Sequence, residues 1–360
     1  MTQLASPPRP PDTGDESTTA EPAVAPPPRF SRRAGWLGLG AVVALVLAVV
    51  LGVGLGTLRL DPLEAVRAIV DPQDSQASVV VWSLRLPRIA VAMLVGGALA
   101  GVGVVMQAVF RNPLADPGVT GVSSGAAVGA VAGITLGLGG SLQWGVPIAA
   151  FAGSLAVALL LQAVLHANRG ASTYTLILVG VSINAFAGAV ISILVANAED
   201  DALARGAVFW LAGDLELRTW THAGIAVVPI VLGLLVLLTR VRALDALLLG
   251  DDVTATSGYD VHRTRLVLLL VASLVTGAAV AASGVIAFVG LVVPHAVRLV
   301  VGAKHSLLLP LSVVCGALFL VVTDTIARTA SVTVVVQTGA VCAVIGAPVF
   351  LAMLLSRRAT

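Results

Sequence analysis

Long runs of apolar residues recur along the chain from about residue 35 to the C-terminus, separated by short polar segments. A run of about 20 apolar residues is long enough to cross the hydrocarbon core of a membrane as a helix. Windows of that length predict ten spans, at residues 35–57, 87–109, 115–137, 145–166, 173–195, 220–239, 265–283, 285–302, 307–327 and 336–356. The pattern therefore predicts an all-α integral membrane protein with about ten transmembrane helices.

The run at 115–137 has an irregular start. The stretch RNPLADPGVTG, which leads into it, contains two prolines and an aspartate. Proline removes a backbone donor and disrupts helical geometry. We therefore expect either a plain span here or a broken, re-entrant element.

Composition agrees with a membrane protein. Hydrophobic residues make up 58% of the chain, charged residues 11%, and the mean hydropathy is +1.00, values outside the range of soluble globular domains. A formal net charge of only +2 does not suggest nucleic acid binding. Residues 1–33 differ, because Pro, Ser, Thr and acidic residues dominate them. They are predicted to be a disordered cytoplasmic tail, and residues 34–360 are predicted to form the ten-span domain.

The distribution of basic residues predicts the orientation. An even number of spans places both termini on one side of the membrane. If that side is the cytoplasm, about two thirds of the 21 lysines and arginines fall in cytoplasmic segments. Cytoplasmic segments of membrane proteins carry an excess of Lys and Arg. Both termini are therefore predicted to be cytoplasmic.

Two arginines precede the second apolar run, in the stretch WSLRLPRIAVAMLVGG. Pro87 suggests the first helical turn, where a cation faces the positive end of the helix dipole and costs roughly 0.3–1 kcal/mol. Arg85 and Arg88 also share a helical face, being three residues apart. They either reach to lipid phosphates or pair with Asp71 and Asp74, or they dock an acidic partner outside the cell.

Small residues recur at four-residue spacing in two predicted spans. Such stripes let helix backbones approach closely in lipid, and a smooth wall of a transport pathway is the alternative. The residues are Gly97 and Gly101 in one span and Gly121, Gly125, Gly129 and Gly133 in the next.

The longest cytoplasmic loop, residues 240–264, reads RVRALDALLLGDDVTATSGYDVHRT and is amphipathic. Gly250 and Gly258 interrupt it, and arginines flank it. This pattern favours short helices joined by turns that dock a cytoplasmic partner. An ordinary solvated loop is the alternative.

Few polar side chains fall inside the predicted spans, where such groups are functional candidates by default. They are Gln107, Asn184, His295 and Gln337, with Asp324 near the outer end of a span. His295 follows Pro294, so it is expected to line a helix break and bond a freed carbonyl, with a proton relay as the alternative. No paired carboxylates lie at mid-membrane depth in the predicted spans, which disfavours a proton-coupled secondary transporter.

Enzymatic and cofactor chemistry is not indicated. No spaced acidic motif for a metal–diphosphate substrate and no Ser, His and Asp set is present. Cys315 and Cys342 lie in apolar runs and suggest neither a disulfide nor a metal site. The one lysine, Lys304, is not part of a phosphate-binding loop. We expect no catalysis and no cofactor in this chain, and if transport is ATP-driven, another chain must bind the ATP.

Several motifs, in order, closely resemble the FecCD-type permeases of type II ABC importers. They are LRLPRIAVAMLVGGALAGVGVVMQAVFRNPLADPGVTGVSSGAAVGA, FWLAGDL, GVIAFVGLVVPHAVRLVVG and IGAPVFL. The resemblance implies a ten-span subunit in the cytoplasmic membrane, paired with a second copy or a homologous chain. It also implies two cytoplasmic ATPase subunits and an extracytoplasmic substrate-binding protein as partners.

The resemblance also assigns roles to residues. It implies that Arg85, Arg88 and Arg328 meet glutamates of the binding protein. The loop resembles the family's coupling helices, which implies ATPase contacts at Gly250, Asp251, Ala255, Gly258 and Arg265. The candidates for the pathway or a helix break are Gln107, Asn184, Pro294 and His295.

The segment ASVTVVVQTGAVCAVIGAP departs from the family pattern. It keeps Gly339, Gly346 and Pro348 but lacks the two prolines and the glutamate of a turn that usually precedes the tenth helix.

The expected function is import of an iron(III)–siderophore complex by alternating access. Haem or cobalamin import by the same machinery is the alternative, and a non-ABC secondary transporter is a weaker one.

Overall fold

A computed structural model describes residues 32–56, 61–70, 75–138, 144–168, 173–330 and 335–356. Most of the predicted N-terminal tail, Asp71, Asp74 and residues 331–334 of the departing segment lie outside these ranges. The described part is a bundle of helices, which confirms the predicted fold class.

Seven described helices are long and apolar enough to cross a membrane. They are α1 (Arg32–Gly54), the continuous helix Gln76–Val109 that contains α4 (Leu86–Val109), α7 (Gly145–Ala167), α8 (Thr173–Ala196), α10 (Trp220–Thr239), α13 (Val261–Ser283) and α15 (His305–Ala330). Three shorter apolar helices are α5 (Val122–Thr135), α14 (Val289–Val301) and α16 (Thr338–Ser356). These ten helices coincide with the ten predicted spans to within a few residues at most ends.

Other short helices lie between the spans. They are α2 (Pro62–Val70), α9 (Asp201–Leu211), α11 (Val241–Leu249) and α12 (Asp251–Thr256). The sequence predicted the last two as short helices joined by turns, and this is confirmed. It missed α2 and α9, because an amphipathic segment of about ten residues gives no membrane signal.

The helix that carries Arg85 and Arg88 begins earlier than predicted. Ser75 caps α3 (Gln76–Val79), and the chain continues through a π-helical turn, Val80–Arg85, into α4. The wider π turn lets the helix pass Pro87, which has no N–H and whose ring crowds the preceding turn. Pro87 lies in the first turn of α4, as predicted, but the continuous helix begins at Gln76. The predicted cost of placing two cations at the positive end of a helix is therefore wrong.

The irregular start of the third span is confirmed. Pro117–Thr120 form a short 3-10 turn, and the Asp116 carboxylate accepts a hydrogen bond of 2.8 Å from the Gly118 N–H. Gly121 then adopts a φ of 80°, which favours glycine. The short helix α5 follows this break.

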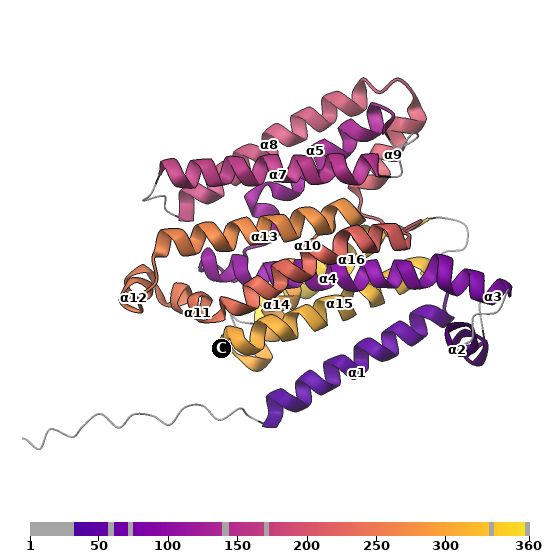
Figure 1. The fold of residues 1–360 in the computed structure, drawn as a ribbon, viewed down its shortest axis with the longest axis horizontal. Coiled ribbons are helices and arrows are strands. Elements are labelled where there is room, and N and C mark those ends of the chain that lie inside the picture. The colour runs from indigo at the N-terminus through magenta and orange to yellow at the C-terminus, as the bar shows by residue number, and fades with distance from the viewer. Residues whose placement is uncertain are drawn as a thin grey trace, which may run out of the picture.

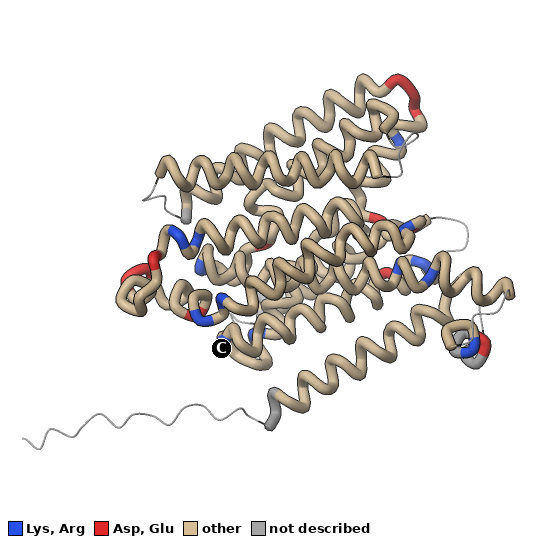
Figure 2. The backbone as a smooth tube through the Cα atoms, in the orientation of Figure 1, with Lys and Arg blue, Asp and Glu red and all other residues tan. Residues whose placement is uncertain are grey.

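Figure 1 shows α5, α7 and α8 on one flank of the bundle and α1 on the opposite flank, with α4 and α13–α16 between them. Most charged residues lie toward the two ends of the long helices (Figure 2). One end carries α11 and α12, together with the start of α1 and the end of α16 (Figure 1). The other end carries Arg85, Arg88 and Arg328, and we call it the arginine end.

Glycines allow close contact between helices, which confirms the packing interpretation for α5. A Cβ atom on Gly125 would overlap the Gly153 carbonyl of α7, and one on Gly129 would overlap the Ala149 carbonyl. Gly121 forms the turn before α5, and a Cβ on it would also overlap the Ile183 side chain of α8.

The helices α4 and α15 also approach closely, and they run antiparallel. A Cβ on Gly96 would overlap the Gly316 carbonyl oxygen, and a Cβ on Gly316 would overlap the Gly96 carbonyl oxygen. The predicted stripe residues Gly97 and Gly101 lie against Val313. The stripe in α4 is therefore a packing surface as well.

Candidate functional site

At the arginine end, one buried carboxylate holds two of the three predicted docking arginines. The Nε of Arg88 on α4 donates to both oxygens of Asp324 on α15, at 2.9 and 3.1 Å. The Nε of Arg328, one turn further along α15, lies 3.1 Å from Asp324 Oδ2. Thr338, at the start of α16, donates to Asp324 Oδ1 at 2.9 Å. Asp324, with 1% of its side chain exposed, therefore joins three helices.

The arginines also bind the end of α1. Arg85 donates to the carbonyls of Val53 and Gly54, and Arg328 donates to those of Gly52 and Leu55. The last carbonyls of a helix lack partners within the helix, and the negative end of its dipole favours a cation. Arg85 and Arg328 therefore cap the C-terminus of α1.

The structure thus brings Arg85, Arg88 and Arg328 together, as the docking hypothesis requires. Their guanidinium groups are engaged within the chain and largely covered, since only 13% of the Arg88 side chain and 10% of the Arg328 side chain are exposed. Docking of a binding protein stays a prediction. An acidic partner would have to share these cations with Asp324 and with the end of α1.

The sequence pattern indicated only that Asp324 is a polar residue near the outer end of a span. The spacing of four residues between Asp324 and Arg328 was a usable signal for an ion pair on one helical face. The contact with Arg88 joins residues 236 positions apart, and no local pattern could reveal it.

At the opposite end, Gly250 separates α11 from α12 with a φ of 132°. Asp251, the next residue, accepts a bond of 2.8 Å from Arg265 at the start of α13. It also pairs with Arg111, just after α4. Two of the predicted coupling residues, Asp251 and Arg265, are thus directly bonded to each other.

The other predicted coupling residues lie on the surface of the same segment. Ala255 is exposed on α12, and Gly258 ends that helix with a φ of 84°. Leu249 and Val253 add exposed apolar surface, at 71% and 40% exposure. This end therefore presents a structured, partly apolar surface suited to a protein partner.

A further contact at this end was not predicted. The backbone N–H of His305, the first residue of α15, donates to Asp245 Oδ1 at 2.9 Å, and its ring Nδ1 donates to the same oxygen at 2.6 Å. Asp245 belongs to α11, and the two residues are 60 positions apart. Neither residue stood out in the sequence.

The candidate pathway residues lie in contacts between helices. Gln107 on α4 is 1% exposed and donates to the Leu291 carbonyl of α14 at 3.3 Å. Asn184 on α8 donates to the Gly118 carbonyl at 3.2 Å and accepts from Ser124 at 2.7 Å. These bonds fasten helices together, and a pathway role for either residue stays a prediction.

The expected helix break at Pro294 is wrong. α14 runs through Pro294 from Val289 to Val301, and His295 is 1% exposed within it. A proline inside a helix deprives only one carbonyl, four residues earlier, of its partner. Here that residue is Gly290, which packs closely against Gly103 of α4, so neighbouring helices hold α14 in place.

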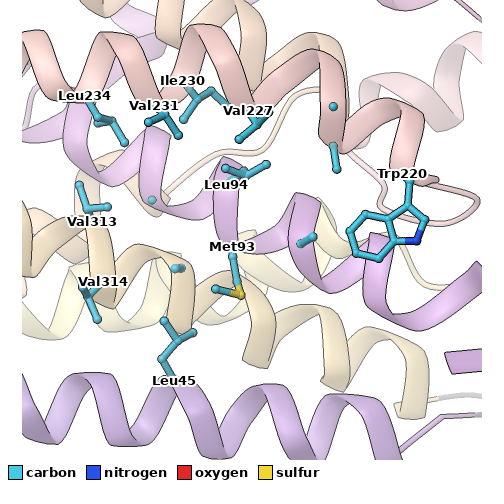
Figure 3. Close-up of a pocket in the computed structure, with 15 residues that line it drawn as sticks. Leu45, Met93, Leu94, Trp220, Val227, Ile230, Val231, Leu234, Val313 and Val314 are labelled. Atoms are coloured by element: carbon cyan, nitrogen blue, oxygen red, sulfur yellow. The ribbon is translucent and has the colours of Figure 1, made fainter. Parts of the chain in front are cut away.

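An apolar groove of about 650 Å³ lies between α1, α4, α10 and α15 (Figure 3). Leu45, Met93, Leu94 and Val313 line it, with Trp220 toward the arginine end. None of the described residues that line it is ionisable. Such a surface suits hydrocarbon, and burying a polar iron chelate there without partners would be unfavourable.

Comparison with known proteins identifies the family. A model of the FecCD transport family matches residues 44–356. A cobalamin import system permease protein, BtuC, from Halobacterium salinarum is 48% identical over 78% of this chain and 74% of its own. A hemin transport system permease protein, HmuU, from Yersinia pestis is 37% identical over 87% of this chain and 94% of its own. A solved inward-facing chain assigned to a metal-chelate type ABC transporter is 29% identical, with a TM-score of 0.78 over 89% of this chain and 99% of that one. This chain therefore belongs to the FecCD transport family and is the permease component of an ABC importer.

Proposed function

We propose that this permease moves a metal–chelate cargo into the cytoplasm by alternating access. Two structured ends support the proposal. The surface of α11 and α12 would bind an ATPase subunit on the cytoplasmic side, and the arginine end would face an extracytoplasmic binding protein. ATP would be bound and hydrolysed by two partner ATPases, and a second permease subunit, the same chain or a homologous one, would complete the pathway.

The cargo has two leading candidates. The permease that is 48% identical to this chain over the matched region bears the name of a cobalamin importer, and this favours cobalamin. The sequence motifs alone favoured an iron(III)–siderophore, and this cargo is the second candidate. Haem is a third, supported by the hemin permease at 37% identity.

Uptake of labelled cargo tests the proposal. Cells lacking the gene and complemented cells would receive cobalamin, haem, and ferric siderophores of hydroxamate and catecholate type. We expect loss of cobalamin uptake alone, restored by the wild-type gene. Loss of a ferric siderophore alone would move the proposal to the second candidate, and uptake of the whole panel at wild-type rates would contradict it.

A second arm tests the machinery. Uptake should stop when the phosphate-loop lysine of the partner ATPase is replaced, because ATP hydrolysis drives the conformational cycle. Uptake that persists in that variant but collapses when an ionophore removes the proton gradient would point to secondary transport.

A further inference from the structure

The helices α4 and α15 are joined at the centre of the bundle. The Gly96 and Gly316 backbones meet there without side chains between them. Close-packed interiors transmit displacement because they deform little. A shift of one helix along the membrane normal would therefore carry the other with it.

The same two helices are joined at the arginine end. The bond between Arg88 of α4 and Asp324 of α15 is bidentate and nearly fully buried. A charge-assisted, two-pronged contact fixes orientation as well as distance. Sliding of α4 past α15 would break it and leave charges buried without partners, which is strongly unfavourable.

Each helix is also fastened to α11 or α12 at its other end. Arg111, two residues after the end of α4, pairs with Asp251 of α12 and donates to the Leu247 carbonyl of α11 at 2.8 Å. Arg111 has a backbone φ of 47°, a value that residues other than glycine rarely adopt. His305, at the start of α15, is bound twice by Asp245 of α11.

We propose that α4 and α15 form a rigid two-helix strut that carries movement between the α11–α12 segment and the arginine end. Asp245 and Asp251 act as positioning residues that fasten the strut at one end, and Asp324 fastens it at the other. From Arg88 to Val109, the last residue of α4, the strut is about 32 Å long at 1.5 Å per residue, enough to cross the membrane core. This inference rests on the proposed function, since it needs an ATPase at one end and a binding protein at the other.

A strut of this kind has a thermodynamic signature. If both ends move as one body, nucleotide bound by the ATPase changes the affinity of the binding protein, typically by a factor of about 5–150. Cutting the attachment at the α11–α12 end should reduce that factor without changing the arginine end. A merely structural role for these aspartates would not change the factor selectively.

The experiment uses the assembled transporter in lipid nanodiscs. The Kd of the binding protein is measured with and without a non-hydrolysable ATP analogue. Asp245→Asn and Asp251→Asn are suitable variants, because 37% and 46% of these side chains are exposed and a loss of charge there is tolerable. Arg111→Gly removes the same ion pair as Asp251→Asn, and glycine accepts the φ of 47° without strain.

We expect the nucleotide-dependent factor to fall partway toward 1 in each single variant, because the other attachment remains, and to approach 1 when Asp245→Asn and Asp251→Asn are combined. The Kd without nucleotide should stay within about twofold of wild type. Asp201→Asn, an exposed carboxylate on α9, is the matched control and should keep the factor. The strut proposal would be overturned if the variants kept the wild-type factor. It would also be overturned if the ATP analogue left the Kd of the binding protein unchanged in the wild-type transporter. Release of the ATPase from the variants would also overturn it, because the aspartates would then be contacts that bind the ATPase and not positioning residues of the strut. If wild type bound neither partner, the proposed function itself would fail.

Discussion

Asp324 shows how much one buried carboxylate can organise. It accepts hydrogen bonds from Arg88 and Thr338 and forms an ion pair with Arg328, while 1% of its side chain is exposed. Removing one partner of a buried ion pair costs about 3–5 kcal/mol, because the remaining charge loses its partner. Asp324→Asn should therefore lower the free energy of unfolding by several kcal/mol, as measured by thermal unfolding in detergent. Asp201→Asn, at the exposed first turn of α9, should change it by less than about 1 kcal/mol, because it loses only a favourable interaction with the helix dipole. Equal effects in the two variants would show that the cluster adds no stability.

Arg328 allows a separate test of docking. Arg328→Gln keeps an amide that can donate to the carbonyls at the end of α1 but removes the charge. Charge complementarity acts mainly on association rate and its salt dependence. We expect the binding protein to associate several-fold more slowly with this variant, with a weaker salt dependence, while the ATPase stays bound. An unchanged association rate would confine Arg328 to its capping role on α1.

The contact between α4 and α15 depends on the absence of side chains. Gly316→Ala would push a methyl group into the Gly96 carbonyl, and overpacking of this kind costs typically about 1–3 kcal/mol. Gly188→Ala, on α8, is the matched control because a Cβ there meets nothing within 4 Å. Alanine is the better helix former, so this control should be neutral or slightly stabilising in the same unfolding measurement. Destabilisation of both variants to the same extent would point to a general glycine effect.

The turn after α12 allows a test of coupling. Gly258 has a φ of 84°, whereas proline fixes φ near −65°. Gly258→Pro should distort the segment between α12 and α13, so that ATP hydrolysis continues without transport or the ATPase is released. Gly258→Asn should behave close to wild type, since asparagine tolerates positive φ. Coupled transport by the proline variant, measured in proteoliposomes, would place the docking surface elsewhere.

Hydropathy located the membrane helices well because each span is a local property of about 20 consecutive residues. The π turn at Val80–Arg85 was missed because hydrogen-bond register has no hydropathy signal. The ion pairs at both ends were missed for another reason. Arg88 and Asp324 are 236 positions apart, and Arg111 and Asp251 are 140 apart. Only the folded bundle brings such residues together, so the sequence could nominate the arginines but not their partner.

The whole bundle has two chemically different ends, and its orientation in the membrane decides which partner each end meets. Exposed positions report it directly: Ala255 lies on α12, and Glu199 lies between α8 and α9. In a variant without Cys315 and Cys342, Glu199→Cys should react with a membrane-impermeant maleimide in intact spheroplasts. Ala255→Cys should react only after permeabilisation, because the excess of basic residues places its end in the cytoplasm. The reverse pattern would invert the topology. The ATPase would then have to dock at the arginine end, where the guanidinium groups are already engaged by Asp324 and α1, and the proposed division of partners would be wrong.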